Sequence, residues 1–209
     1  MRHVAGILLA AGVGARFGAH KLLAPLADGT PLAVAAARPL RRAVDDVIAV
    51  VRPGDAELSA LFRTERLRVI ECAQAGQGMG HSLGAGVAAL PEAAGWVIAL
   101  ADMPYIRDAT IAGVARAVAD GALMAAPFHR ERRGHPVAFS AGMRAELVAL
   151  SGDRGARELL VRHARMLTRI DVDDPGILLD VDTPADLAPF AGGQNSTLAP
   201  RNRPVDDGS

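Results

Sequence analysis

The feature that most constrains the fold is an apolar run near the start of the chain that ends in a glycine-rich turn. Residues 3–10 read His-Val-Ala-Gly-Ile-Leu-Leu-Ala, and such a run bounded by glycine is typical of a buried parallel strand. The turn contains three glycines, Gly12, Gly14 and Gly18. Glycines leave backbone N–H groups open to a bulky anion, and Arg16 and Lys21 add positive charge. The pattern predicts a nucleoside triphosphate cradle at the carboxyl end of the first strand.

Length and composition favour a single enzyme-sized domain. The chain has 209 residues, half of them hydrophobic, which is enough for one sizeable α/β core. Its 23 basic and 23 acidic residues balance, which argues against a nucleic-acid binder, because such proteins need a net basic face. The one cysteine, Cys72, excludes an intrachain disulfide and a cysteine-rich metal cluster. We expect Cys72 to be a small buried residue.

The chain shows no sign of membrane association. The apolar stretch at the N-terminus is short and soon followed by glycines, unlike a signal peptide. No run approaches the roughly 18 apolar residues that a membrane helix requires. We therefore expect a soluble, cytoplasmic protein with neither membrane nor nucleic-acid partners.

Strand-like and helix-like segments alternate along the chain. Strands are predicted at 3–10, 47–51, 68–71, 96–100, 121–127 and 167–172, and a further short strand is predicted to end at Ser140. Helices are predicted at 32–42, 55–62, 83–90, 108–119, 143–150 and 156–163. Thr30 with Pro31 is the expected start of the first helix. This alternation predicts right-handed crossovers, a parallel sheet, and ligand binding outside the carboxyl ends of the strands. Residues 192–209 lose periodicity and are predicted to form a disordered tail.

The spacing of the first loop excludes two common phosphate-binding loops. A dinucleotide fingerprint would need glycine at position 17, where Phe17 stands. A Walker A loop would need a serine or threonine directly after the lysine, and Leu22 follows Lys21. An ordinary turn with exposed charges remains the alternative interpretation of the loop.

Asp102 is the strongest candidate for a metal ligand. It directly follows an apolar strand, at the edge of the sheet where ligands bind. Mg²⁺ prefers one or two carboxylates together with phosphate oxygens. The alternative role is an N-cap for the next helix, but Asp108 and Thr110 are better placed for that cap.

Asp182 is a candidate for the second carboxylate. Asp180 and Asp182 are two residues apart in an extended segment, so their side chains point the same way. Thr183 and Pro184 also resemble the start of a helix, with Thr183 as cap. The two roles are compatible.

Two further segments carry polar groups with two possible roles. Ser82, after His81 in a second glycine-rich loop at 75–84, either reads a base or anion or is a simple N-cap. Arg132, Arg133, Gly134 and His135 form either a solvated hairpin or a site for an anionic second substrate.

Eight short motifs occur in one order along residues 3–190: Leu9-Ala-Ala-Gly12, Arg16-Phe-Gly18, Lys21, Pro25-Leu26, Ser82-Leu83, Asp102-Met-Pro104, Gly134-His-Pro136 and Asp180-Val-Asp-Thr-Pro184. Together they resemble the MobA-like nucleotidyltransferases, and within them the molybdenum cofactor cytidylyltransferase branch. The branch assignment rests on Ala11, where guanylyltransferase relatives usually carry glycine, and on the last three motifs.

The resemblance implies a fold and a set of site residues. The fold would be a Rossmann-like three-layer α/β/α domain over 1–191, with a mostly parallel sheet of the nucleotide-diphospho-sugar transferase-like type. CTP would be held by one set of residues: Leu9, Ala10, Ala11, Gly12, Gly14, Lys21, Gly78 and Ser82. Arg16, Lys21 and Asp102 would be catalytic, and Mg²⁺ would be held by Asp102 with Asp182.

The resemblance also implies a reaction. The terminal phosphate of molybdopterin, bound near Arg133, Gly134 and His135, would attack the α-phosphorus of CTP and release pyrophosphate. A molybdenum hydroxylase apoenzyme is a further implied partner. Three alternatives remain open: nucleotidyl transfer with GTP or to another phosphorylated acceptor such as a sugar or polyol phosphate, a cofactor-binding maturation chaperone, and a dinucleotide-binding oxidoreductase, which the loop spacing disfavours.

Overall fold

The computed structural model describes residues 3–12, 17, 20–153 and 155–187. Gly14, Arg16 and Gly18 of the predicted cradle, and the predicted tail at 192–209, therefore lie outside the described residues. Among the helices of the described part, none is both long and apolar enough to span a membrane.

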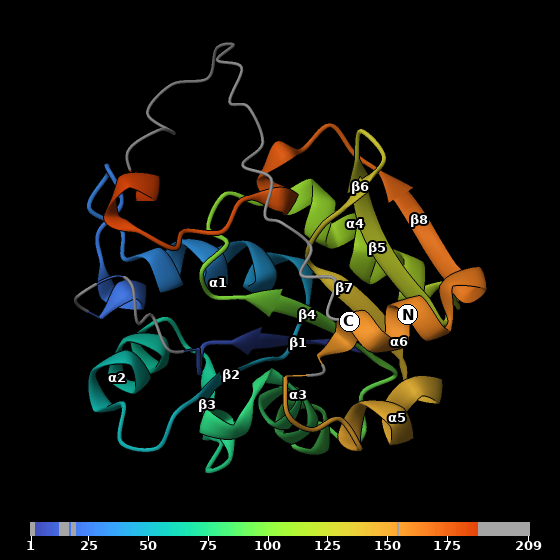
Figure 1. Ribbon diagram of the computed structural model, residues 1–209, viewed down its shortest axis with the longest axis horizontal. Helices are drawn as coiled ribbons and strands as arrows, with labels where there is room; N and C mark the ends of the chain where they lie inside the picture. Colours follow the sequence, from blue (N-terminus) through green and yellow to red (C-terminus); the bar gives the residue numbers. More distant parts are fainter. Residues whose placement is uncertain (1–2, 13–16, 18–19, 154, 188–209) are drawn as a thin grey trace, which may run out of the picture.

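An eight-stranded mixed sheet forms the centre of the molecule (Figure 1). Its order is β3-β2-β1-β4-β7-β5-β6, and β8 pairs with β5. The strands are β1 (Val4–Leu9), β2 (Val47–Val51), β3 (Arg68–Glu71), β4 (Gly95–Leu100), β5 (Met124–His129), β6 (Arg132–Arg133), β7 (Val137–Ser140) and β8 (Leu167–Asp171). Strands β3, β2, β1 and β4 are mutually parallel, as are β5 and β8. The sheet is thus mostly parallel, as predicted.

The strand β7 interrupts the parallel run, which the alternation of elements did not predict. It lies between β4 and β5 and is antiparallel to both. The chain between His129 and Val137 is too short for the crossover that parallel strands require, so antiparallel pairing follows. A tight turn with positive φ at Arg130 (47°) and Glu131 (65°) first reverses the chain from β5 into β6. The strand predicted at 121–127 begins three residues after its predicted start, at Met124.

Helices cover both faces of the sheet. One face carries α1 (Leu32–Ala43), α2 (Ala56–Thr64) and α4 (Asp108–Ala119), and the other carries α3 (Met79–Ala88), α5 (Arg144–Val148) and α6 (Ala156–Arg162). Figure 1 shows α3 and α5 side by side below the sheet, in accord with their contacts. Six short 3-10 helices complete the described part of the chain: Lys21–Leu23, Ala75–Gln77, Ala141–Met143, Ala164–Met166, Pro175–Leu178 and Pro184–Leu187.

Two hydrophobic cores result, one on each side of the sheet. Every residue of β1 is buried. Val4 and Leu8 point into the core under α1 and α4, whereas Ala5 and Ile7 point into the core over α3. This alternation on a strand buried on both faces confirms the predicted three-layer α/β/α architecture. Cys72 is buried in the second core, as expected.

Some predicted helix caps are wrong. The first helix begins at Leu32, and Pro31 is its N-cap residue. Thr30 instead uses its N–H to bond the Asp28 carboxylate at 2.9 Å, within a turn. Asp55 does cap α2, since its side chain accepts from the Leu58 N–H.

The bounds of α4 are as predicted, but its capping differs from the prediction. The helix begins at Asp108, but neither Asp108 nor Thr110 caps it. The buried carboxylate of Asp174, from the other end of the chain, accepts from the Arg107 N–H (2.9 Å) and the Thr110 hydroxyl (2.6 Å). A tertiary contact therefore replaces the local cap.

Candidate functional site

A cavity of about 590 Å³ opens at the carboxyl ends of β1 and β4. The first loop, the first turn of α3 and the segment around Asp182 form its walls. Nine predicted site residues line it: Leu9, Ala10, Ala11, Gly12, Lys21, Gly78, Ser82, Asp102 and Asp182. Gly14 and Arg16 lie outside the described residues. Residues far apart in sequence thus meet where ligands bind on open α/β sheets.

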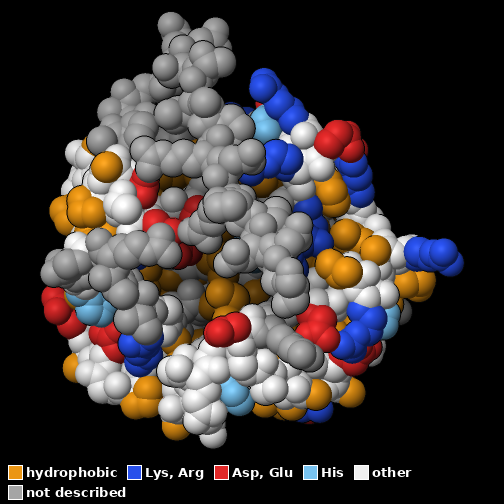
Figure 2. Space-filling view, in the orientation of Figure 1, with side chains coloured by type: hydrophobic (Ala, Val, Ile, Leu, Met, Phe, Trp, Pro, Cys, Tyr) orange, Lys and Arg blue, Asp and Glu red, His pale blue; other side chains and the backbone are white. Residues whose placement is uncertain are grey.

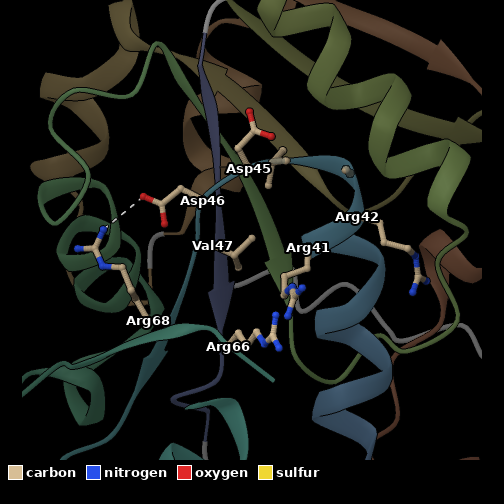
Figure 3. Close-up of a pocket in the computed structure, with 9 residues that line it drawn as sticks. Arg41, Arg42, Asp45, Asp46, Val47, Arg66 and Arg68 are labelled. Atoms are coloured by element: carbon tan, nitrogen blue, oxygen red, sulfur yellow. Dashed lines mark hydrogen bonds and ion pairs between the residues drawn. The ribbon is translucent and has the colours of Figure 1, made fainter. Parts of the chain in front are cut away.

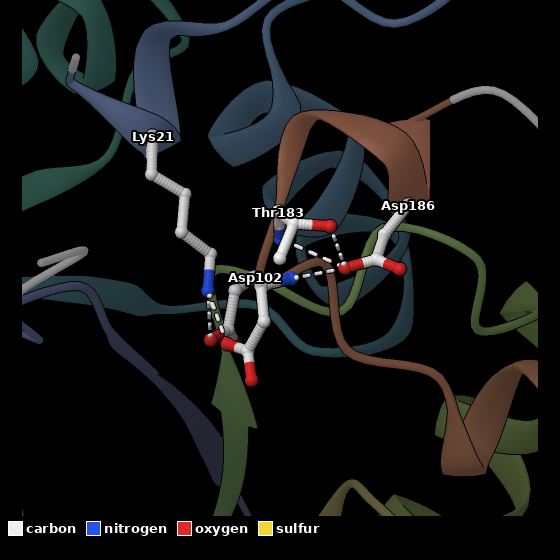
Figure 4. Close-up of polar contacts among 5 residues, drawn as sticks. Lys21, Asp102, Thr183 and Asp186 are labelled. Carbon is white, nitrogen blue, oxygen red and sulfur yellow. Dashed lines mark hydrogen bonds and ion pairs between the residues drawn. The ribbon is translucent and has the colours of Figure 1, made fainter. Parts of the chain in front are cut away.

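The floor of this cavity carries one ammonium between two carboxylates (Figure 4). Lys21 Nζ lies 3.0 Å from Asp102 Oδ2 and 3.0 Å from Asp182 Oδ1. The Lys21 side chain is 10% exposed, and the aspartates are 29% and 31% exposed. Burial lowers the pKa of Lys21, but the two carboxylates together outweigh it and raise the pKa above its ordinary value. Lys21 is therefore a charged counter-ion.

Two contacts hold Asp182 beside Asp102. The Val181 N–H donates to the Asp102 carbonyl at 2.9 Å, which joins the end of the described chain to the loop after β4. The Asp186 carboxylate accepts from the Asp182 N–H (3.2 Å), the Thr183 N–H (2.8 Å) and the Thr183 hydroxyl (2.8 Å), as Figure 4 shows. The 3-10 helix begins at Pro184, which confirms the predicted start. The Asp186 carboxylate, rather than the Thr183 side chain, accepts the backbone N–H groups there.

The cavity is acidic within the described part of the chain. Four carboxylates line it, those of Asp55, Asp102, Asp153 and Asp182. The cations there are Lys21 and Arg52, and the Nε2 atom of His20 lies 2.9 Å from Asp55 Oδ2. Figure 2 shows acidic side chains gathered in the hollow left of centre on this face. An anionic ligand in this cavity would need an added cation.

The sheet fixes the backbone where the first loop begins. The Ala10 N–H donates to the Val50 carbonyl (2.9 Å), and the Leu9 carbonyl accepts from Ala101 (3.0 Å). These groups are used by the sheet, so Leu9 and Ala10 shape the wall of the cavity rather than offer those atoms to a ligand. Arg52 Nε donates to the Ala11 carbonyl at 2.7 Å, which ties the loop to the end of β2.

The second glycine-rich loop is shorter than predicted, because α3 begins at Met79 rather than Leu83. Ser82 therefore lies inside the helix, and the N-cap alternative for it is wrong; Gly78 is the N-cap residue. Gly78 has φ +125°, and a Cβ there would lie 2.1 Å from the carbonyl carbon of Gly152. The Gly80 N–H bonds the Gly152 carbonyl at 2.9 Å. Glycine at 78 thus allows the 151–153 turn to close against the helix.

The predicted second-substrate group does not line this cavity. Arg133 ends β6, Gly134 is buried against Ile177, and the His135 N–H donates to the Ile177 carbonyl at 3.0 Å. Burial foremost, then the charge of Arg157, lowers the pKa of Arg133. Burial, with Arg133 next, lowers the pKa of His135 to about 4, against the opposing effect of Asp180. His135 is therefore neutral, and its buried Nδ1 has no partner among the described residues.

A second cavity, of about 340 Å³, lies at the opposite, amino edge of the sheet (Figure 3). Arginines and aspartates line it, including Arg41, Arg66 and the Arg68–Asp46 pair at 3.3 Å. Figure 3 shows the Arg41 and Arg66 side chains directed toward one another and Asp45 directed away. None of the predicted site residues lies there.

The sequence-based interpretation missed several residues around the main cavity. Asp186 could have been found, because Thr183-Pro-Ala-Asp186 has the spacing of a capping box. Arg52 and the His20–Asp55 pair also line the cavity, but no sequence motif predicts their role. Asp153 reaches it only through the turn that closes on Gly78.

Comparison with known proteins identifies the family. Residues 6–166 match the MobA-like NTP transferase domain. Nicotine blue oxidoreductase of Paenarthrobacter nicotinovorans is 31% identical over 188 residues, which cover 86% of this chain and 92% of that protein.

Solved structures share the fold over most of this chain. Rv0371c from Mycobacterium tuberculosis H37Rv has a TM-score of 0.73 and 28% identity, over 88% of this chain and 95% of that one. It is also known in complex with manganese, with a TM-score of 0.68 and 25% identity over 82% and 88% of the two chains. A nucleotidyl transferase from Methanothermobacter thermautotroptrophicus has a TM-score of 0.74 at 21% identity, over 88% and 94%, a likeness of fold.

The architecture is thus the nucleotide-diphospho-sugar transferase-like α/β fold that was predicted. Its main cavity lies at the carboxyl ends of the parallel strands, where ligands bind on open α/β sheets. With the match over residues 6–166, these features are those of a nucleotidyltransferase-type enzyme. The chain belongs to the family of the MobA-like NTP transferase domain.

Proposed function

We propose that the protein transfers CMP from CTP to the terminal phosphate of molybdopterin, forming molybdopterin cytosine dinucleotide and pyrophosphate. The observation that carries the proposal is the convergence of Lys21, Asp102 and Asp182 on the floor of the main cavity, with 3.0 Å contacts. A lysine and two carboxylates beside the carboxyl end of β4 fit a site that, with an added divalent cation, would balance the charge of a triphosphate.

The nucleotide would lie along the first loop. Its phosphates would meet the backbone of Ala11, Gly12 and Gly14 and the charge of Arg16, and its base would lie toward Gly78 and Ser82. Gly78 and Ser82 are available for this role, because both line the cavity at the start of α3. Ala11, buried against the core over α3, is the residue on which the choice of cytosine over guanine rests.

Asp102 and Asp182 would hold Mg²⁺. The residues fit the ion, since Mg²⁺ takes one or two carboxylates and completes its shell with phosphate oxygens and water. The excess of carboxylates in the described part of the cavity favours an added cation for the same reason. The manganese complex of Rv0371c gives a family precedent for a divalent metal. When bound, the metal supplies charge stabilisation to the phosphates.

The chemistry follows from charge and position. A terminal phosphate oxygen of the acceptor forms a bond to the α-phosphorus as the bond from that phosphorus to the bridging oxygen of pyrophosphate breaks. Pyrophosphate leaves with the electron pair of that bond. Arg16 and Lys21 would neutralise the charge that develops on the leaving group. A phosphate nucleophile needs no strong general base, so positioning and neutralisation carry the catalysis.

Arg133, Gly134 and His135 would bind the acceptor. Within the described part of the chain, Arg133 makes no ion pair with a carboxylate, and its neighbouring charge is the like charge of Arg157. A partly desolvated guanidinium in that position favours an anionic ligand.

A pyrophosphate-release assay tests the proposal. Each of the four nucleoside triphosphates would be incubated with Mg²⁺ and the enzyme, with and without molybdopterin. We expect release only with CTP and molybdopterin together. Release with GTP but not CTP would overturn the base assignment. Release with CTP and a sugar or polyol phosphate, but not with molybdopterin, would overturn the acceptor.

One observation favours a second candidate function. Nicotine blue oxidoreductase, at 31% identity, carries the name of a redox enzyme, so the same scaffold would here bind a dinucleotide and transfer electrons. Oxidation of NADH or NADPH by the purified protein with an added acceptor, followed at 340 nm, would support this function if all nucleotidyl transfer were absent. Tight molybdopterin binding without turnover of any nucleotide would instead indicate a carrier that serves a molybdenum hydroxylase apoenzyme.

A further inference from the structure

The Lys21 ammonium occupies the place between the two carboxylates that a metal ion would use. It lies 3.0 Å from one oxygen of Asp102 and 3.0 Å from one oxygen of Asp182. A magnesium ion binds such oxygens at about 2.1 Å, so on these same two atoms it would meet the ammonium at close range. The carboxylates remain about 30% exposed to the cavity, at 29% and 31%, whereas Lys21 is 10% exposed. The aspartates are open to an incoming ion, and the lysine stands in its way.

The charges around this place determine whether the ammonium or a divalent metal ion occupies it. Without a nucleotide, the ammonium has two charge-assisted hydrogen bonds on these carboxylates. The other carboxylates that line the described cavity are those of Asp55 and Asp153, and Asp55 already pairs with His20 at 2.9 Å. A divalent ion that enters alone must either expel the ammonium or remain beside it against like-charge repulsion in a partly buried site.

A triphosphate removes this conflict. Its oxygens provide new acceptors for the ammonium within the same cavity, and they also complete the coordination shell of the metal. We propose that Lys21 is the resident counter-ion of Asp102 and Asp182, and that it yields this place to a divalent cation only when a nucleotide brings phosphate oxygens to receive the ammonium. Metal and nucleotide then bind together, and free metal binds weakly. The exchange on nucleotide binding rests on the proposed nucleotidyl-transfer function, whereas the counter-ion role of Lys21 does not.

Manganese binding tests the exchange directly, because free Mn²⁺ is measured by its electron paramagnetic resonance signal. The wild-type protein would be titrated with Mn²⁺ alone and with the α,β-methylene analogue of CTP, which does not react. We expect the analogue to tighten Mn²⁺ binding by about tenfold or more. A wild-type protein that binds one Mn²⁺ as tightly without the analogue as with it would overturn the proposal, whatever the variants do.

Lys21→Met is the informative variant, and Lys21→Arg is its matched control. Without nucleotide, Lys21→Met should bind Mn²⁺ at least about tenfold more tightly than wild type, because two carboxylates lose their counter-ion. Lys21→Arg keeps the charge and should bind no more tightly than wild type. The double variant Lys21→Met/Asp102→Asn should lose the gain, which assigns it to these carboxylates. Equal affinities in Lys21→Met and wild type would overturn the counter-ion role.

The outcomes also separate this inference from the proposed function. If the protein turns over CTP but also binds free Mn²⁺ tightly, nucleotidyl transfer is supported and the cation exchange at Lys21 is contradicted. Absence of any nucleotide binding or turnover removes the function, yet the comparison of Lys21→Met with wild type still tests the counter-ion role.

Discussion

Asp102 is the residue on which the proposed chemistry depends most directly. Asp102→Asn keeps the shape of the side chain and removes the charge that would hold the metal, so kcat should fall by about 10² or more. Asp45→Asn is the matched control, because Asp45 is an exposed carboxylate at the far edge of the sheet and its loss should leave kcat unchanged. Pyrophosphate release measures both. Near-normal turnover in Asp102→Asn would contradict the metal role.

Arg133 should act on the acceptor and leave nucleotide binding intact. Its guanidinium is partly buried and has a positively charged neighbour, so it would contribute attraction for an anionic substrate. Arg133→Ala should raise the KM for molybdopterin by about tenfold, an effect of the size of one charged contact, with KM for CTP unchanged. Steady-state kinetics with each substrate varied in turn checks this. A change confined to CTP would place the acceptor elsewhere.

His135 gives the folded protein a pH dependence. Its pKa is about 4 when folded, against an ordinary value of 6.5, so the unfolded chain binds the proton first as the pH falls. Stability from this residue is therefore complete above pH 6.5 and declines between 6.5 and 4, by at most about 3 kcal/mol. Urea unfolding across this range should show a steeper decline for wild type than for His135→Asn. Parallel declines would show that His135 is not kept neutral by the fold.

At the scale of elements, Asp174 holds the start of α4. Its buried carboxylate accepts from the Arg107 N–H, the Thr110 hydroxyl and the Gly176 N–H. Asp174→Ala should lower the free energy of unfolding by about 2–3 kcal/mol, because a cap is lost and buried donors are left without a partner. Thr110→Val, which removes one of these donors, should cost about 1 kcal/mol. Equal effects of the two variants in urea unfolding would contradict the capping role.

The second glycine loop offers a matched pair of substitutions. At Gly78 the backbone has φ +125° and a Cβ would clash with Gly152, whereas at Gly76 a Cβ would meet nothing within 4 Å. Gly78→Ala should therefore destabilise the fold by about 2 kcal/mol or more, and Gly76→Ala should stay within about 0.5 kcal/mol. Thermal unfolding of both variants checks this. A silent Gly78→Ala would mean that the 151–153 turn does not need this close approach.

The elements divide clearly into those that the sequence could predict and those that it could not. Strands β2 and β3 have the predicted bounds, because an apolar or alternating run between turn residues is a local signal. The start of α3 and the cap of α4 could not be predicted, because Gly78 is an N-cap through its contact with Gly152 and Asp174 caps α4 from 64 residues away. Caps made by tertiary contacts leave no local pattern.

At the scale of the whole molecule, most of the site could be predicted from the topology of a parallel sheet. Parallel strands bring their carboxyl ends together, so Asp102 could be placed beside the first loop from the sequence alone. Asp182 lies close to Asp102 because the Val181 N–H bonds the Asp102 carbonyl. No spacing in the sequence predicts this hydrogen bond. The predicted acceptor residues failed to join the main cavity because β7 turns back antiparallel beside β4, and the chain before it packs on Ile177.

The main cavity draws its walls from segments spread over the whole described chain, between Leu9 and Asp182. A ligand that joins these segments should stabilise the entire fold, by about 2.7 kcal/mol at a concentration one hundred times its Kd. With Mg²⁺ present, CTP should therefore raise Tm by several degrees and GTP by less, as the proposed preference for cytosine requires. The same nucleotides with EDTA are the control and should give smaller shifts, because the acidic cavity then opposes the phosphates. Equal shifts from all four nucleotides would contradict a base-selective loop, and equal shifts with and without metal would contradict the role given to Asp102 and Asp182.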